Sequence, residues 1–254
     1  MDKRLAGFLS KTVTTLFVAL FIRTFLFQPF NIPSGSMKPT LLVGDYVLVS
    51  KLSYGYTHYS IPFSPRLFSG RIFATPPERG DVVVFRLPKD DTTDYVKRVI
   101  GLPGDRIQMK EGVLHINGVP VKQERIEDFV GGEPCGEELG ANVRTKQWKE
   151  TLPNGVSYRT LDCVPNGFYD NTNPYRVPQG HYFLMGDNRD NSTDSRVLSA
   201  VGYVPFENLI GRVEVIHYSR YPGSTDLFTG ARWDRMLTSL RPHRSDASDD
   251  GHGS

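Results

Sequence analysis

Residues 79–105, RGDVVVFRLPKDDTTDYVKRVIGLPGD, contain two strand-like runs with a polar segment between them. The runs, 79–88 and 94–105, are rich in Val, Ile, Tyr and Phe, residues that favour strands. Because the short segment between them carries Lys89, Asp90 and Asp91, the pattern predicts a β-hairpin.

Similar short apolar runs recur along the chain. We expect further strands within 44–55, 106–121, 180–196 and 209–219, with a turn at Asn117-Gly118 and the last strand of the chain in 209–219. Together with 24 Gly and 18 Pro in 254 residues, these runs predict a mainly β protein built on an antiparallel β-sheet domain with many turns.

The overall composition is that of a folded globular protein, with 39% hydrophobic and 23% charged residues. The formal net charge is only +2. The chain has no long Lys/Arg-rich stretch that could follow a phosphate backbone, so we expect no nucleic-acid partner.

One apolar run, 12–30, TVTTLFVALFIRTFLFQPF, is about long enough to cross a bilayer as a helix. Lys3, Arg4 and Lys11 precede it, so the positive-inside rule predicts a cytoplasmic N-terminus and a domain on the far side. Arg23 is costly within such a span. A helix lying in the membrane plane and a cleaved signal peptide therefore stay open as alternatives.

These observations divide the chain into four parts. We expect a cytoplasmic segment (1–11), a transmembrane helix (12–30), a β-rich external domain (31–240) and a disordered tail (241–254). Within the domain, 56–79 is predicted to be an aromatic-rich loop, whose side chains either pack on the core or enter the lipid interface. Residues 123–178 are predicted to be a polar insertion with a few short strands.

Both cysteines, Cys135 and Cys163, lie in this insertion. They lack the CxxC or Cys/His spacing of a metal site, so we expect no metal. Two free thiols and a disulfide both agree with the count, and a location outside the cytoplasm favours the disulfide.

Two serines, Ser34 and Ser36, lie in the segment PSGSM just after the apolar run. A serine hydroxyl becomes a nucleophile only beside a base, yet the six histidines are scattered and a G-x-S-x-G elbow is absent. Lys97 is an alternative base, because strand alternation in DYVKRVIG places it between apolar neighbours. Burial there would favour its neutral amine, whereas a lysine that reaches the surface would stay charged.

Three segments, PSGSM (33–37), YVKR (95–98) and GDNRDNSTDSR (186–196), follow the apolar run in this order. Together they closely resemble the motifs of the bacterial type I signal peptidases, membrane-bound proteases that remove signal peptides from exported proteins. The resemblance covers about 30–120 and 180–219 as well as the apolar run.

This resemblance implies a Ser-Lys dyad that needs no cofactor, with Ser36 as nucleophile and Lys97 as general base. Ser34 matches the serine whose hydroxyl joins the backbone N–H of Ser36 in binding the oxyanion. Ser192 matches a residue that orients the lysine amine. In the same way, the resemblance implies that Asp194 and Arg196 form a supporting ion pair. Asp187 and Arg189 are expected to have a structural role.

The resemblance further implies two shallow apolar pockets that accept small side chains of an extended substrate. The matching positions are Phe30, Ile32, Pro33, Met37, Leu41, Val47, Val84, Tyr95 and Val96.

The partners implied are the signal peptides of exported preproteins and the lipid of a bacterial cytoplasmic (inner) membrane, with the catalytic domain on the periplasmic side. Contact with the secretion machinery is left open. A self-cleaving repressor-type Ser-Lys protease shares the chemistry, but the membrane anchor argues against it. An inactive membrane-tethered binding module is opposed by the intact Ser36, Lys97 and Ser192.

Overall fold

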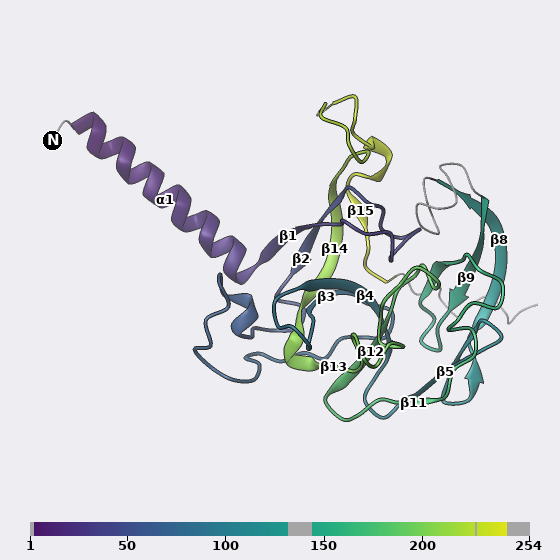
Figure 1. Ribbon diagram of the computed structural model, residues 1–254. Helices are drawn as coiled ribbons and strands as arrows, with labels where there is room; N and C mark the ends of the chain where they lie inside the picture. The colour runs from purple at the N-terminus through teal and green to yellow at the C-terminus, as the bar shows by residue number, and fades with distance from the viewer. Residues whose placement is uncertain (1–2, 132–143, 227, 243–254) are drawn as a thin grey trace, which may run out of the picture.

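The computed structural model describes residues 3–131, 144–226 and 228–242, and shows a single helix attached to a β-rich body (Figure 1). Helix α1 (Lys3–Phe25) projects from one side of the body. All strand pairs are antiparallel. The prediction of a mainly β, antiparallel fold is confirmed.

The largest sheet has eight strands and carries most of the functional residues. Its order is β1 (Phe27–Asn31), β2 (Asp45–Ser50), β14 (Leu209–Ser219), β3 (Val82–Arg86), β4 (Asp94–Gly101), β12 (His181–Met185) and β13 (Val204–Pro205), with β15 (Thr238–Ser239) paired to β14.

Two smaller sheets complete the body. One contains β11 (Tyr175–Arg176), β5 (Arg106–Lys110), β6 (Val113–Ile116) and β7 (Val119–Pro120). The other contains β10 (Ser157–Asp162), β9 (Arg144–Thr151) and β8 (Lys122–Val130). Within the described residues, three short 3₁₀ helices lie between strands: η1 (His58–Ser60), η3 (Phe206–Asn208) and η4 (Trp233–Arg235).

The predicted hairpin of 79–105 is present as β3 and β4, with Val83 opposite Lys97. The predicted Asn-Gly turn joins β6 to β7, and Asn117 and Gly118 have φ of 55° and 86°. Two consecutive positive φ values define the type I′ turn that matches strand twist.

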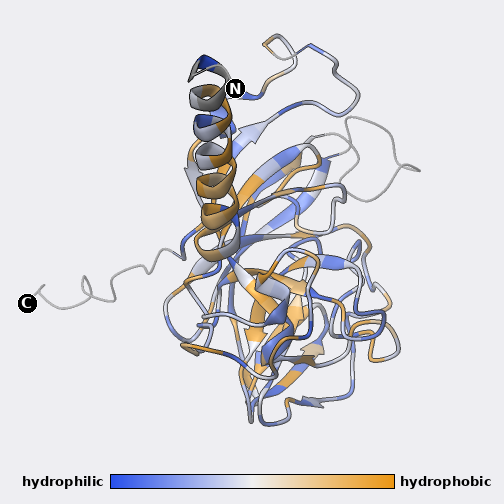
Figure 2. Ribbon diagram, turned by 90° about the vertical axis from the view of Figure 1, so that its left-hand side faces the viewer, coloured by the Kyte–Doolittle hydropathy of each residue, from blue (hydrophilic) through white to orange (hydrophobic). Residues whose placement is uncertain are grey.

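Three clusters of buried apolar side chains form the core. One lies under β5 and β6, a second around β2 and β14, and a third between β3, β4 and β12. Figure 2 shows hydrophobic residues concentrated on the strands of the body and along α1, whose N-terminal end is more hydrophilic. Because the second and third clusters meet along β3 and β4, these central strands are fixed on both faces.

The helix differs from the predicted span of 12–30, since it begins at Lys3 and ends at Phe25. Residues Gly7–Phe25 are apolar and long enough to cross a bilayer. Pro29 lacks an N–H and cannot continue a helix, and it lies instead in β1, which pairs with β2 at the edge of the sheet. Arg23 is therefore in the last turn of α1 and not near the middle of a span.

One other expectation needs correction. Residues 209–219 are not the last strand, because β15 follows and pairs with β14. The strands expected within 123–178 are present, and β8, β9 and β10 form a three-stranded sheet. Polar residues occupy its inward face, among them the buried Thr145, Gln147 and Glu150, so its strands lack the usual hydrophobic alternation.

Residues 56–79 form a loop around η1, closed by a single bridge between Tyr56 and Ile72. Its aromatic and aliphatic side chains divide into packed and exposed ones. Tyr59 packs against the core, whereas Phe63, Leu67 and Phe73 are exposed. Contact of these exposed side chains with lipid stays a prediction. Of the predicted tail, 243–254 lies outside the described residues.

Candidate active site

The PSGSM segment lies in the connection between β1 and β2, where the chain turns back on itself. Backbone bonds from Lys38 N–H to the Gly35 carbonyl and from Leu41 N–H to the Met37 carbonyl close successive turns. The loop after β12 also fixes the segment through the buried Asn188. Asn188 donates its backbone N–H to the Ser36 carbonyl and its side-chain amide N–H to the Gly35 carbonyl, both at 3.1 Å.

Strand β4 brings Lys97 to this segment. Lys97 Nζ lies 2.7 Å from Ser36 Oγ and donates to the Val96 carbonyl oxygen at 3.0 Å. The lysine is only 3% exposed. The two residues that the resemblance paired are 61 positions apart in sequence and are in hydrogen-bond contact.

Burial lowers the pKa of Lys97 from 10.5 to about 8. Asp194 and Asp187 oppose this shift, and Arg196 adds to it. The two carboxylates have only a partial effect because each is paired with an arginine: Asp194 with Arg196 at 2.9 Å and Asp187 with Arg98 at 2.6 Å. About a tenth of the amine is therefore neutral at pH 7, several hundred times the neutral fraction of a lysine with the ordinary pKa.

Asp194 and Arg196 form the predicted ion pair, fully buried and joined by two hydrogen bonds of 2.9 Å. Burial opposes ionisation of Asp194, but Arg196 and the Gly186 N–H outweigh it and lower the pKa of this carboxyl. Arg189 pairs in the same manner with Glu150, in agreement with a structural role.

Ser34 is exposed, and its Oγ lies 3.3 Å from Ser36 Oγ. Both hydroxyls therefore face the same space. An oxyanion formed on a carbonyl attacked by Ser36 would arise close to this second hydroxyl, so the geometry is compatible with the role expected for Ser34.

Ser192 differs from its expected position. Its hydroxyl is buried and interacts with Asp194, whose pKa it helps to lower, and no hydrogen bond between it and Lys97 is found among the described residues. The side chain instead covers Gly186, where an added Cβ would lie 2.2 Å from Ser192 Oγ and 2.5 Å from the Ser36 carbonyl oxygen. The orienting role of Ser192 stays a prediction.

A cavity of about 400 Å³ opens beside the two serines. It contains seven of the nine predicted pocket positions: Phe30, Ile32, Pro33, Met37, Val84, Tyr95 and Val96. The other two, Leu41 and Val47, do not line it, because their fully buried side chains turn inward and pack behind Ile32 and Met37 in the core.

Several polar residues of this site were not found in the sequence. Asn31, Thr93, Asp94, Asn191 and Thr193 also line the cavity. They come from three separate loops or strand ends, and no spacing pattern unites them. Asn188, which holds the PSGSM segment, lies within the GDNRDNSTDSR stretch, but no feature of the sequence distinguishes it from its neighbours.

The remaining predicted site residues are the cysteines. Cys163 is disulfide-bonded, and Cys135 lies outside the described residues, so their pairing stays a prediction. No group of three or more His, Cys, Asp or Glu side chains in the described part of the chain is arranged to hold a metal ion.

Comparison with known proteins identifies a family for this chain. The family model described as signal peptidase, peptidase S26, matches residues 5–218. A signal peptidase I of Rickettsia typhi is 44% identical over 210 residues, covering 80% of this chain and 76% of its own length. The signal peptidase I of Rickettsia massiliae is 44% identical over 215 residues, covering 82% and 77%.

A solved structure of a signal peptidase I from Enterococcus faecalis is 25% identical and covers 54% of this chain and 97% of its own. Its TM-score of 0.31 is too low to bear on the fold.

Proposed function

The chain belongs to the signal peptidase family, peptidase S26, and from this premise we propose that it cleaves signal peptides from exported preproteins with a Ser36-Lys97 dyad. The family makes it a serine endopeptidase. The observation that carries the dyad is the 2.7 Å contact between Ser36 Oγ and the amine of a lysine that is almost wholly buried.

In the first step, the neutral Lys97 amine takes the Ser36 proton as Oγ attacks the scissile carbonyl. The negative charge that develops on the carbonyl oxygen is stabilised by the Ser36 backbone N–H and the Ser34 hydroxyl. Lys97 then gives its proton to the departing amine, which leaves the signal peptide as an ester on Ser36.

In the second step, water attacks the ester. The amine of Lys97 is again neutral after it has protonated the leaving group, so it can take a proton from this water. The tetrahedral intermediate collapses, and Ser36 regains its proton from Lys97. This cycle returns both residues to their starting state.

The strand edges beside the cavity suit an extended substrate. Strand β1 pairs only with β2 in the described part of the sheet, and the pairing of β12 with β4 begins at Arg98, which leaves Asp94–Lys97 without a second neighbour. A substrate strand can bond to both free edges while its small side chains enter the apolar cavity.

The family is membrane-anchored, and α1 supplies a helix long enough for this purpose. The basic residues near the start of α1 support a cytoplasmic N-terminus. The β-rich body, with Ser36, would then lie on the outer side of a bacterial cytoplasmic membrane, where exported chains emerge. Contact with the secretion machinery stays open.

A cleavage assay with full-length enzyme in detergent and a preprotein substrate tests the dyad. We expect Ser36→Ala and Lys97→Met each to lose cleavage by at least about 10³-fold, whereas Ser239→Ala and Lys110→Met, at exposed positions on β15 and β5, keep it. A penem-type acylating agent should label Ser36, as mapped by mass spectrometry. Full activity in either dyad variant would contradict the mechanism.

Of the two rival functions, a self-cleaving repressor-type protease is set aside by the family match, which includes α1. An inactive binding module would show no cleavage and no acyl adduct in the wild-type chain, so the same assay separates it from the proposal.

A further inference from the structure

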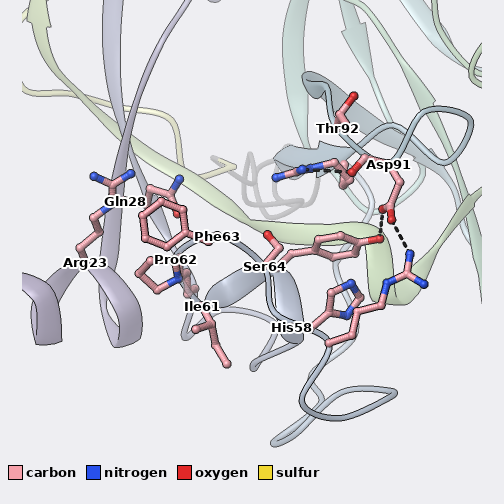
Figure 3. A pocket seen from close by; sticks show the side chains of 13 residues that line it. Arg23, Gln28, His58, Ile61, Pro62, Phe63, Ser64, Asp91 and Thr92 are labelled. Carbon is pink, nitrogen blue, oxygen red and sulfur yellow. Dashed lines mark hydrogen bonds and ion pairs between the residues drawn. The ribbon is translucent and has the colours of Figure 1, made fainter.

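A second cavity, of about 440 Å³, lies where the end of α1 meets the loop after β2 (Figure 3). None of its lining residues also lines the cavity beside Ser36 and Lys97. Arg23 and Gln28 border one part of it, and His58 and Asp91 border another. We call it the cationic cavity, because its charged and basic lining residues are Arg23, Lys51, His58, Arg66, Arg86 and one acid, Asp91.

The single acid of the cationic cavity is already engaged. Asp91 accepts hydrogen bonds from Tyr59 and, at 2.8 Å, from Arg66. Arg86 is paired with Asp94, also at 2.8 Å. These contacts leave Asp91 unavailable to neutralise further cations.

Arg23 and Lys51 have no acidic partner in the described ranges. Lys51 is 2% exposed, and its ammonium donates only to the Ser60 carbonyl, at 2.6 Å. Burial, followed by the nearby charge of Arg23, lowers the pKa of Lys51 to about 8. Two cations that repel each other and lack a counter-ion form a favourable place for an anion.

An apolar groove of about 460 Å³ adjoins the cationic cavity and shares Ile61 with it. Its wall includes Phe21 and Phe25 from α1 and Phe68 and Phe73 from the loop. A ligand that fills both spaces has one anionic end and one hydrocarbon end.

The position of Arg23 along α1 indicates where such a ligand would come from. Arg23 is in the last turn of the apolar stretch Gly7–Phe25, so an anchored helix places it at the depth of the outer headgroups. Phe63 and Leu67, in the same loop, are fully or largely exposed, as suits side chains at the lipid interface.

We propose that the cationic cavity binds the phosphate of an anionic membrane phospholipid, held by Arg23 and Lys51, with an acyl chain in the adjoining apolar groove. The site goes beyond peptide cleavage and rests on the membrane anchoring proposed above. It fixes the body at the membrane through a headgroup as well as through the helix.

Native mass spectrometry of the full-length chain in neutral detergent tests this site. We expect phosphatidylglycerol to bind about tenfold more tightly than phosphatidylcholine, and the double variant R23Q/K51M to bind both equally. The conservative variant R23K should keep the preference. Matched controls are K110M and R176Q on β5 and β11, which lie on the side of the body away from α1 (Figure 1).

Equal binding of the two lipids by the wild type, or a preference that survives in R23Q/K51M, would overturn the site. Inorganic phosphate that binds as tightly as phosphatidylglycerol would assign the cavity to a soluble anion and refute the lipid. Circular dichroism of R23Q/K51M checks its fold, and R23K supplies the independent variant if that fold is lost.

Sedimentation with phosphatidylcholine vesicles separates this inference from the anchoring. A wild-type chain that does not sediment refutes the anchor. A chain that sediments but shows no preference for phosphatidylglycerol refutes only the headgroup site.

Discussion

Replacement of Lys97 by Met should abolish cleavage and, below pH 8, stabilise the protein. The drop in the Lys97 pKa from 10.5 to about 8 corresponds to about 3 kcal/mol against the charged form in the folded state. Below pH 8 both folded and unfolded chains carry the proton, so the wild type bears this full penalty. Between about pH 8 and 10.5 only the unfolded chain is protonated, and wild-type stability rises with pH.

Met fills a similar volume without a charge, and a buried charge replaced by an apolar group is often stabilising. The hydrogen bonds to Ser36 Oγ and Val96 O are lost in Lys97→Met, which offsets part of the gain by about 1 kcal/mol each. Any difference in these bonds between the charged and the neutral amine is already included in the lowered pKa of Lys97. The change with pH is therefore the sharper quantity.

We expect the stability advantage of Lys97→Met over wild type to shrink by about 2 kcal/mol between pH 7 and pH 9.5. Denaturant unfolding of both chains in detergent at a series of pH values measures it, and other titrating groups cancel in the comparison. Lys110→Met, at an exposed position, is the control and should show no such trend. A pH-independent difference would mean that the folded Lys97 has an ordinary pKa, and the argument for a neutral base would fail.

Three further predictions concern the same site. The kcat/KM for a signal-peptide substrate should rise about tenfold per pH unit up to about pH 8 and then level off, and a rise that continues to pH 10 would contradict a buried base. Gly186→Ala should reduce cleavage by more than about tenfold, because the new Cβ would lie 2.5 Å from the Ser36 carbonyl oxygen, whereas Gly7→Ala meets nothing within 4 Å and should be silent. Asp187→Asn should destabilise the fold by about 3 kcal/mol, measured by denaturant unfolding, because it leaves Arg98 buried without its charge partner; a loss below 1 kcal/mol would mean that Arg98 finds another partner.

The fold class could be predicted from the sequence because local signals carry it. Strand runs, an Asn-Gly turn and alternation around Lys97 all depend on residues close together in the chain. The contact of Ser36 with Lys97 is long-range, and only the resemblance of the complete motif set paired them in advance.

Features that depend on packing were not predictable in this way. Leu41 and Val47 resemble the pocket positions in chemistry but lie in the layer behind them. Strands were expected in 123–178, but their bounds and their pairing as β8–β9–β10 were not, because Thr145, Gln147 and Glu150 occupy the inner face of this sheet. The end of α1 was misplaced by five residues, since hydropathy continues through 26–30 while Pro29 and pairing with β2 select a strand.

Two of the buried lysines, Lys51 and Lys97, show why burial alone does not make a base. Lys51 and Lys97 both have a pKa lowered to about 8, chiefly by burial. The closest partner of Lys51 is the Ser60 carbonyl oxygen, which can only accept a hydrogen bond and so favours the charged amine. Lys97 instead meets the Ser36 hydroxyl, which can donate a proton to a neutral amine. The chemistry therefore depends on the neighbour that each amine meets, and of these two described lysines it is Lys97 that contacts a hydroxyl with a proton to give.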